Sequence, residues 1–464
     1  MATRYNFFGG LVTDGLVLDL DAAKLSSYPA GGTAWINISG NGSNGVLNNG
    51  PTFSGVGKQA AIVFDGVDDY VAGPYFSSLP IGSSDRSFGV WFKTSKVLVP
   101  TNYENFIYYG EAASNKALFV SIGNEGGGAN FGNGVHFGAS QYGNAVATTF
   151  DVNDNTWRYG VVTVNNGLWS IYMNGVLNNS KSMTTNTTAS NWLVGAAYAD
   201  IQTPYQGSLS VVQIYNRSIS PFEISQNFNA YKSRYGIPDI VTDGLILNLD
   251  AGNPYSYYSP TSGTTWTDVS GSGNNGTLTN GPVYSNGAIT FDGVDDYASI
   301  SGLANTHSSS SLTLEAWVTV GNSYSYYAGI FGKGTSDNDE EYCLLYNKFS
   351  NKIYMDVGNS GGPYIDATYT LALNTVYHIV GTHVRTGGVS TLTIYVNGSF
   401  VSNTTAANTN PVNVNSYSTT IGSRFQNGVS SWNGKIYNTK IYNKVLSQEE
   451  ITQNYSALRG RYGV

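Results

Sequence analysis

The chain has 464 residues, enough for two large all-β domains, and its hydrophobic fraction of 41% supports a substantial core. Only 11% of the residues are charged and the net charge is −8 without a basic cluster, which argues against nucleic acid as a partner. The single cysteine, Cys343, excludes an internal disulfide, and no run of about 20 apolar residues could span a membrane.

The N-terminal segment, residues 1–11, carries Tyr5, Phe7 and Phe8 ahead of the first expected strand. It has neither the long apolar core nor the small-residue cleavage site of a signal peptide, so we expect no cleaved leader. A short segment with three aromatic rings suits docking on a neighbouring protein. We therefore predict that residues 1–11 anchor the chain.

The dominant feature of the sequence is an internal repeat. VTDGLVLDLDA at residues 12–22 returns as VTDGLILNLDA at 241–251, and FDGVDDY at 64–70 returns unchanged at 291–297. Each copy closes with Arg-Tyr-Gly. The repeat predicts two modules, with boundaries at residues 12–236 and 239–464.

Within a copy, apolar residues alternate with polar ones, which is typical of half-buried strands. Trp169, Ile171 and Met173 share one face, for example, and Asn174-Gly175 directly after them predicts a tight hairpin turn that Asn397-Gly398 repeats in the second copy. The composition fits short strands and tight turns, since there are 56 Gly and 35 Tyr.

One short helix is expected near the end of each copy. Ser220 followed by Pro221 and Glu223, and Ser447 followed by Glu450, have the residue types of a helix N-cap with a capping box. Each module is therefore predicted to be a two-sheet β-sandwich of roughly a dozen strands with one C-terminal helix.

The ordered set of motifs resembles a known family. DGLVLxLDA, Trp with SGxGxxG, FDGVDDY, a Trp-bearing strand, IYxNG and IYNRxLSxxEI together resemble the laminin-G-like, concanavalin A-like jelly roll, and the resemblance covers nearly the whole chain twice. It implies an all-β fold of two tandem jelly rolls. It also implies carbohydrate or protein binding in extracellular proteins, often with calcium, and variants with VTDGLVLxLDA resemble structural proteins of tailed bacteriophages.

Catalysis is not expected. Glycanases with this jelly roll need two carboxylates facing each other, but the corresponding strand has only Glu315, and the first copy has Gly89 there. The acidic run Asp337–Glu341 is interpreted as a solvated loop. A glycan hydrolase remains a distant alternative.

Calcium is a possible cofactor. Each FDGVDDY turn supplies three carboxylates, and oxygen ligands of this kind suit calcium. The competing interpretation is that these side chains bond backbone amides within the turn, as Asp does in many turns. The six residues are Asp65, Asp68, Asp69, Asp292, Asp295 and Asp296.

Tyrosine-rich segments are the candidate ligand or interface residues, because exposed rings can stack on sugar faces or fill protein interfaces. The sequence leaves both uses open. The residues are Tyr103, Tyr108, Tyr109, Tyr257, Tyr258, Tyr324, Tyr326 and Tyr327.

These features together predict a non-enzymatic phage virion protein, attached to a capsid or tail, that decorates the particle or adheres to glycans. The expected partners are other virion proteins or further copies of the chain, and surface glycans. The alternative is a bacterial extracellular lectin or adhesin module.

Overall fold

The structure is a computed structural model of the whole chain. It describes residues 10–55, 57–99, 102–123, 134, 136–141, 144–197, 203–303, 311–322, 326–358, 363–407, 415–426 and 428–464. The predicted anchor residues Tyr5, Phe7 and Phe8, and Tyr324 among the tyrosines, lie outside this set.

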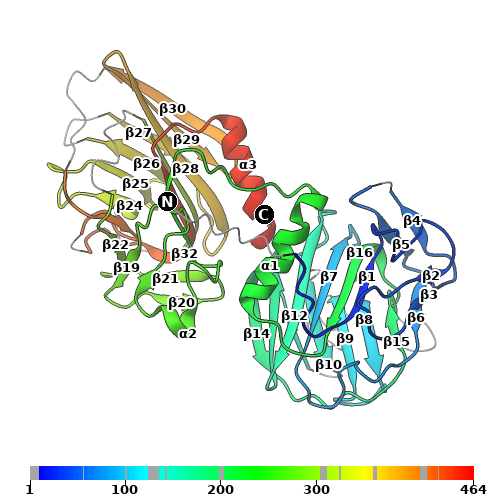
Figure 1. Cartoon of the computed structure of the whole chain (residues 1–464). Helices are drawn as coiled ribbons and strands as arrows, with labels where there is room; N and C mark the ends of the chain where they lie inside the picture. The colour runs from blue at the N-terminus through cyan, green and yellow to red at the C-terminus, as the bar shows by residue number, and fades with distance from the viewer. Residues whose placement is uncertain are drawn as a thin grey trace. The chain divides into compact units, whose positions relative to one another are not determined.

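The chain divides into two compact units between Ile237 and Pro238. The first runs from blue to green in Figure 1 and the second from green to red. Each unit contains two eight-stranded antiparallel sheets within the described residues. The all-β fold of two tandem sandwiches is thereby confirmed.

In the first unit, one sheet has the order β14-β13-β12-β7-β16-β5-β4, with β1 also paired to β16. We call it the helix-covered sheet. Its strands are β1 (Leu16–Asp21), β4 (Thr52–Ser54), β5 (Ala61–Asp65), β7 (Arg86–Lys93), β12 (Arg158–Asn165), β13 (Leu168–Met173), β14 (Val176–Ser182) and β16 (Gln206–Tyr215).

The second sheet of this unit has the order β11-β10-β9-β8-β15-β6-β3-β2. Its strands are β2 (Ala34–Trp35), β3 (Gly45–Asn48), β6 (Tyr70–Gly73), β8 (Tyr103–Gly110), β9 (Ala117–Gly123), β10 (His136–Gln141), β11 (Asn144–Ala147) and β15 (Trp192–Val194).

The second unit repeats this topology. Its helix-covered sheet contains β17 (Leu245–Asp250), β20 (Val283–Ser285), β21 (Ala288–Asp292), β23 (Ser311–Val320), β28 (Val376–Thr386), β29 (Val389–Val396), β30 (Ser399–Ala407) and β32 (Asn433–Tyr442). Its second sheet contains β18 (Thr265–Trp266), β19 (Gly276–Thr279), β22 (Tyr297–Ile300), β24 (Ala328–Lys333), β25 (Tyr342–Asn347), β26 (Lys352–Val357), β27 (Tyr364–Thr368) and β31 (Thr419–Ile421).

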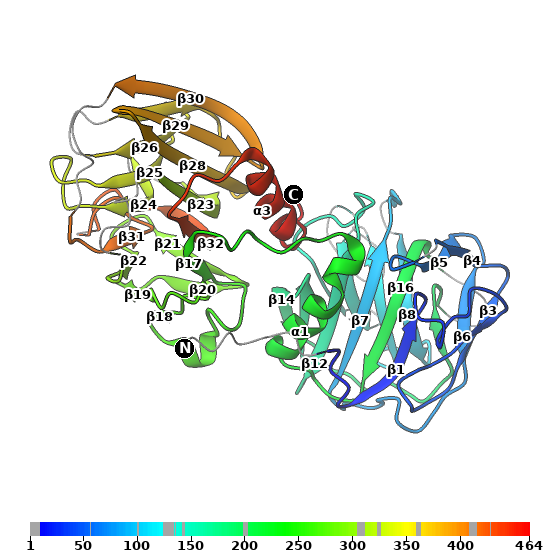
Figure 2. The same cartoon turned by 45° about the horizontal axis from the view of Figure 1, so that its top comes forward.

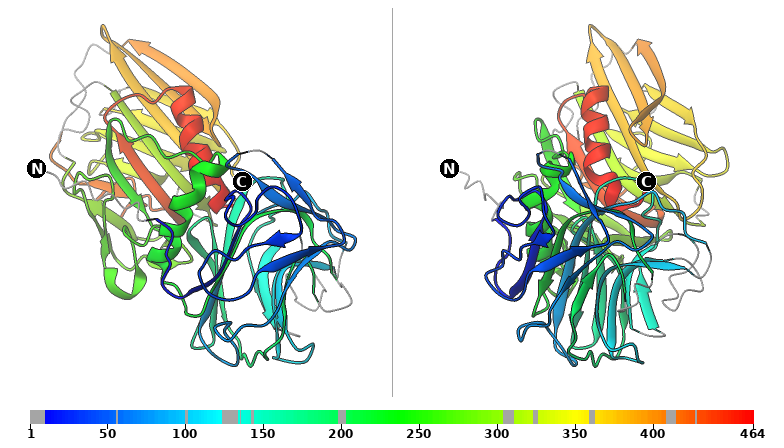
Figure 3. Two further views of the ribbon diagram at one scale, coloured as in Figure 1. Left: turned by 45° about the vertical axis from the view of Figure 1, so that its right-hand side comes forward. Right: turned by 90° about the vertical axis from the view of Figure 1, so that its right-hand side faces the viewer.

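The predicted helices are α1 (Pro221–Tyr231), continued by the 3-10 turn η1 (Lys232–Tyr235), and α3 (Gln448–Leu458), continued by η2 (Arg459–Arg461). Both begin with the predicted capping box: the Ser220 and Ser447 hydroxyls accept the backbone N–H three residues on, and the glutamate there accepts the N–H of the serine. Figures 2 and 3 show each helix lying on strands of its own unit.

Each unit has an apolar layer between its sheets and a second one beneath its helix. Trp91 belongs to the second layer of the first unit, and both Trp91 and Trp317 are fully buried. Trp91 stacks on Tyr235 at a centroid distance of 4.0 Å, and Trp317 stacks on Tyr455 at 5.6 Å. Burial of such rings, each removing an area on the order of 200 Å² from water, fixes the helix to the sheet.

The hairpins form as predicted. Asn174 and Gly175 have φ values of 49° and 87°, and Asn397 and Gly398 have 49° and 75°, which is the left-handed geometry of a tight two-residue turn.

The strands outnumber the predicted dozen, because two-residue strands such as β2 and β18 are too short to show a period in the sequence. The second unit also has a four-residue helix, α2 (Ser259–Ser262), that was not predicted. In the described part of the chain, the helices are too short or too polar to traverse a bilayer.

Candidate functional site

Strand ends bring the acidic turns and some of the predicted tyrosines together at one rim of each sandwich. In the first unit β5 ends at Asp65, which pairs with Gln206 at the start of β16, and β8 begins nearby at Tyr103. In the second unit Asp292 pairs with Asn433 in the same way. We call this edge the rim.

The acidic turn lies on the rim of both units. Oxygens of Asp65, Asp68 and Asp69 lie within 4.8 Å of one another, and those of the second turn do the same. Asp65 Oδ1 accepts the Val67 N–H at 2.8 Å and Asp69 Oδ2 accepts the Asp65 N–H at 2.9 Å. Both interpretations of the turn are therefore compatible: the carboxylates bond amides and still gather three hard oxygen donors.

The electrostatics of the two turns are also alike. Burial raises the pKa of Asp69, and the neighbouring Asp65 and Asp68 add to the rise. Burial likewise raises the pKa of Asp296, and the neighbouring Asp292 and Asp295 add to the rise. A set of three carboxylates fits a calcium ion that takes its other ligands from water, because calcium prefers six to eight oxygens.

A cleft of about 440 Å³ opens on the rim of the first unit. It is lined by Gly66, Lys96, Val97, Leu98, Val99, Asn102, Tyr103, Glu104, Thr203 and Pro204. This volume lies at the lower end of the range for small-molecule sites. The lining combines apolar side chains with about as many polar ones, which are Lys96, Asn102, Tyr103, Glu104 and Thr203.

Glu104 is the buried polar group of this cleft, with 5% of its surface exposed. Its Oε2 accepts the Gln206 N–H at 2.9 Å, and its Oε1 lies 3.7 Å from Lys96 Nζ. Burial raises the pKa of Glu104 to about 7, although the amide and Lys96 counteract the rise. Sequence reasoning missed Glu104, although a glutamate within the strand Tyr103–Gly110 was a usable signal.

The predicted tyrosines do not share one environment. Tyr109 is fully buried and donates to the Pro80 carbonyl at 2.8 Å, Tyr108 donates to the Gly110 carbonyl at 2.9 Å, and Tyr257 donates to the Gly263 carbonyl at 2.8 Å. All three rings are buried, so their proposed role in surface stacking is wrong. Tyr109 points into the core between the sheets, whereas its neighbour Tyr108, on the opposite face of β8, packs with Phe119 and Leu193.

The other described tyrosines reach the surface to different degrees. Tyr258 is half-buried at the start of α2, and Tyr103 is half-buried beside the first-unit cleft. Tyr326 is 59% exposed, and Tyr327, directly after it, is half-buried.

An aromatic cluster surrounds Tyr326 in the second unit. Tyr326 lies nearly parallel to Phe349, with 5.9 Å between ring centroids, and Phe349 is 65% exposed. Tyr327 meets Tyr326 and Tyr354 edge to face at 4.8 and 5.3 Å, and the Arg424 guanidinium lies 5.8 Å from the Tyr327 ring. We call Tyr326, Tyr327, Phe349 and Tyr354 the aromatic rim cluster.

Glu315 is buried in a polar network under α3. Lys440 Nζ donates to its Oε1 at 2.8 Å, Asn454 Nδ2 donates to its Oε2 at 2.6 Å, and His378 Nε2 lies 3.2 Å from Oε1. Burial alone would raise the pKa of Glu315, but the Lys440 ammonium holds it at about 2. The side chain is fully buried, so it does not face a groove.

The acidic run after Gly334 is solvated at its start, where the Asp337 side chain is 68% exposed, but not at its end, which corrects the sequence interpretation for the two glutamates. Glu340 and Glu341 are 1% and 0% exposed. Arg424 donates to both oxygens of Glu340, at 2.9 and 2.8 Å, and Lys333 pairs with Glu341 at 2.9 Å. These pairs tie the loop to β24, the strand that directly precedes it, and to the segment after β31, 84 residues away in the chain.

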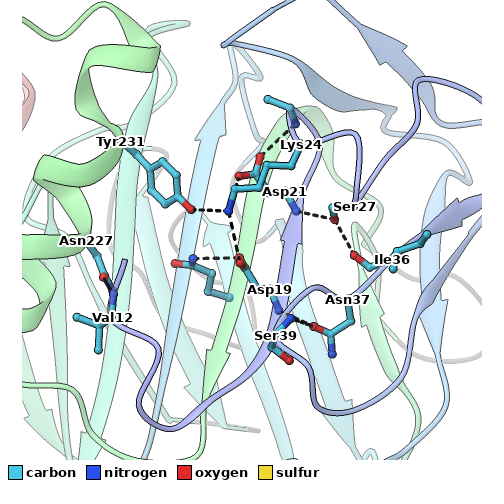
Figure 4. A network of polar contacts seen from close by, with 12 residues as sticks. Val12, Asp19, Asp21, Lys24, Ser27, Ile36, Asn37, Ser39, Asn227 and Tyr231 are labelled. Carbon is cyan, nitrogen blue, oxygen red and sulfur yellow. Dashed lines mark hydrogen bonds and ion pairs between the residues drawn. The ribbon is translucent and has the colours of Figure 1, made fainter. Parts of the chain in front are cut away.

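A second polar network, missed by sequence reasoning, joins β1 to the end of α1 (Figure 4). Lys24 Nζ lies 3.9 Å from Asp19 and 3.5 Å from Asp21, and it donates to the Tyr231 hydroxyl at 3.3 Å. Arg234 donates to both oxygens of Asp21 at 2.8 Å. The cations neutralise both buried carboxylates, so the network fastens the helix to the sheet.

No protein with a curated description matches the sequence. Domain 4 of AbnA, an extracellular GH43 arabinanase of Geobacillus stearothermophilus solved with arabinotriose, is 15% identical with a TM-score of 0.35, covering 46% of this chain and 97% of its own. Trypanosoma rangeli sialidase is 12% identical with a TM-score of 0.36, covering 93% and 68% respectively.

A further solved structure, the CBM40 of the Ruminococcus gnavus IT-sialidase bound to α2,3-sialyllactose, is 14% identical with a TM-score of 0.30, covering 37% of this chain and 98% of its own. The family model described as the concanavalin A-like lectin/glucanases superfamily matches residues 65–225 and 292–452. These two matches span most of both sandwiches, and the chain belongs to the concanavalin A-like lectin/glucanases superfamily, which it contains twice in tandem.

Proposed function

We propose that the protein is a non-enzymatic glycan-binding protein carried on the particle of a tailed phage. The observation that carries the binding part is the exposure of two neighbouring rings, Tyr326 at 59% and Phe349 at 65%, on the rim of the second unit. Large apolar side chains grouped at the surface mark interaction sites. Aromatic faces provide apolar contact area for the C–H face of a pyranose.

Polar groups beside these rings can bond sugar hydroxyls. Lys348, which precedes Phe349, lies with its Nζ 3.3 Å from Asn322 Oδ1, and the Arg424 guanidinium adjoins Tyr327. Such a shallow site binds one sugar weakly. Many copies on one particle would raise the overall avidity, since each further contact becomes intramolecular.

The non-enzymatic part rests on Glu315. A glycosidase needs an accessible pair of carboxyl groups about 5–10 Å apart. Glu315, the one strand carboxylate that matched the sequence argument, is buried and paired with Lys440. Its place in the network supports a structural role.

A glycan array tests the binding proposal. We expect the full chain to bind a subset of glycans and the Tyr326→Ala/Phe349→Ala variant to lose this binding. Phe400→Ala is the matched control, because Phe400 is a similarly exposed ring, at 54%, but lies on β30 in the helix-covered sheet of the second unit. Equal binding by the double variant, or turnover of a bound glycan by the wild type, contradicts the proposal.

The virion part has its own test. Mass spectrometry of purified phage particles should identify the chain, and deletion of residues 1–11 should reduce its incorporation. Absence of the chain from particles contradicts the virion location, and undiminished incorporation of the deletion variant contradicts the anchor.

A further inference from the structure

The rims of the two units have the same backbone but different side chains. The Asn105 N–H bonds the Thr203 carbonyl in the first unit, and the Gly329 N–H bonds the Ser430 carbonyl in the second. Thr203 and Ser430 both have positive φ, 53° and 64°, an uncommon conformation for these residues. These shared features align Asn105 with Gly329.

The alignment places Glu104 of the first unit opposite Ala328 of the second, and Ala328 is only 2% exposed. Lys96 aligns with Asn322 in the same manner, because the residue two positions before each of them accepts an equivalent backbone N–H. The Thr94 carbonyl accepts from Asn155, and the Val320 carbonyl accepts from Asn374. The second unit therefore forms the same rim without a charged residue at either of these two positions. Burying a carboxyl group is costly, so its presence in the first unit calls for a role other than stability.

The cleft beside Glu104 is suited to a ligand. Glu104 Oε2 is engaged by the Gln206 amide, which fixes the carboxyl group and leaves Oε1 toward Lys96. The 3.7 Å between Oε1 and Lys96 Nζ exceeds a normal hydrogen bond. A hydroxyl group can bridge the two, since it donates to the carboxylate and accepts from the ammonium.

The charge of the cleft selects the ligand class. Above pH 7, where Glu104 is ionised, it and Lys96 are opposite charges, so a cationic or anionic ligand would satisfy one and repel the other. A neutral ligand with adjacent hydroxyl groups satisfies both. We propose that the first-unit cleft binds a neutral polyhydroxylated molecule of about the size of one sugar residue.

This site is separate from the aromatic rim cluster, and the inference does not rest on it. The apolar walls of Val97, Leu98 and Pro204 and the half-buried ring of Tyr103 would contact the C–H groups of such a ligand, and Asn102 adds a further amide.

Titration of the full chain with neutral monosaccharides, followed by ligand-observed NMR, tests the proposal. Galacturonic acid and glucosamine serve as charged comparators. We expect at least one neutral sugar to bind more tightly than either comparator. Glu104→Ala and Lys96→Asn, which install the second unit's own residues, should each weaken that binding at least tenfold.

Two controls keep the outcomes distinct. Both substitutions copy residues that the second unit already accommodates, and an unchanged unfolding midpoint verifies that the variants fold. Tyr326→Ala/Phe349→Ala should leave monosaccharide binding intact, which separates this site from the proposed glycan surface. Absence of binding by every neutral sugar, preference for a charged one, or unchanged affinity in Glu104→Ala overturns the inference.

Discussion

Lys440 donates a 2.8 Å hydrogen bond to Glu315 in the second unit, and neither side chain is exposed. In the first unit the same register holds Gln213 and Gly89. A Cβ atom on Gly89 would lie 2.8 Å from the Tyr159 hydroxyl, so tyrosine fills the space that Glu315 takes in the second unit. At this register the duplicated fold thus accommodates either the Glu315–Lys440 ion pair or the uncharged residues Gly89 and Gln213, of which Gln213 donates to the nearby Asp19.

Glu315→Ala should destabilise the second unit by about 3–5 kcal/mol, because it leaves the buried Lys440 ammonium without its partner. Urea unfolding of the full chain, with hydrogen exchange assigning the loss to the second unit, measures this effect.

The matched control for that prediction is Glu315→Gly/Lys440→Gln/His378→Tyr, which reproduces the first unit's residues. We expect it to be more stable than Glu315→Ala, since no buried charge remains unpaired. A stable Glu315→Ala variant would contradict the assigned role of the ion pair.

Loss of either capping box should weaken its own unit only. Ser220→Ala and Ser447→Ala each remove the hydroxyl that accepts the third helical N–H, which costs about 0.5–2 kcal/mol. Thermal unfolding measures the change, and Ser182→Ala at the exposed end of β14 is the control. An effect of the control as large as that of the caps would refute the assignment.

Glu104 should make the first unit less stable as pH rises. Its pKa is about 7 in the folded protein against an ordinary 4.5, so between these values the folded state retains a proton that the unfolded state releases. Stability therefore falls across pH 4.5 to 7, by at most about 3 kcal/mol.

Glu104→Gln should remove this pH dependence, and Glu111→Gln, at a side chain 62% exposed, should leave it unchanged. Unfolding free energies of the first unit at pH 4.5, 6 and 7.5 provide the test. Parallel pH profiles for the wild type and Glu104→Gln would show that the carboxyl group is not perturbed by burial.

Calcium should stabilise both units through the acidic turns. A cation relieves the repulsion of three carboxylates whose oxygens lie within 4.8 Å. At tenfold excess over its dissociation constant it would add about 1.4 kcal/mol, or roughly 3–6 °C in unfolding midpoint. Thermal unfolding with calcium and with EDTA measures the shift.

Asp68→Asn/Asp295→Asn should abolish the calcium effect, because both residues are exposed members of the turns and their loss leaves the core intact. Magnesium at equal concentration separates specific binding from ionic screening. Identical shifts with the two ions, or in the double variant, would favour the view that the aspartates serve only the turn.

Local patterns accounted for much of the fold. The repeat, the Asn174-Gly175 turn and the Ser220 cap could be predicted because each depends on residues adjacent in sequence. The environment of a side chain could not be predicted in this way. Tyr109 and Tyr326 both belong to tyrosine-rich segments, yet one is fully buried and the other is 59% exposed.

The candidate sites depended still more on distant residues. Glu104 obtains its environment from Lys96 and Gln206, and the latter is about a hundred residues away in the chain. Glu340 was misjudged because its partner Arg424 lies 84 residues away in the chain. Glu341 was misjudged because its partner Lys333, in the preceding strand, meets it only when β24 and β25 pair. Alternation shows which side of a strand a residue occupies, but it does not show what lies opposite.

The amino-acid sequence by itself determined the duplication, the all-β class, the capped helices and the family, since these follow from periodicity and short motifs. Only the tertiary structure decided which acids are buried and paired, which rings face water, and that the first unit's rim has a charged cleft where the second has Ala328. The reason is that burial and charge pairing arise between strands that fold together from remote parts of the chain.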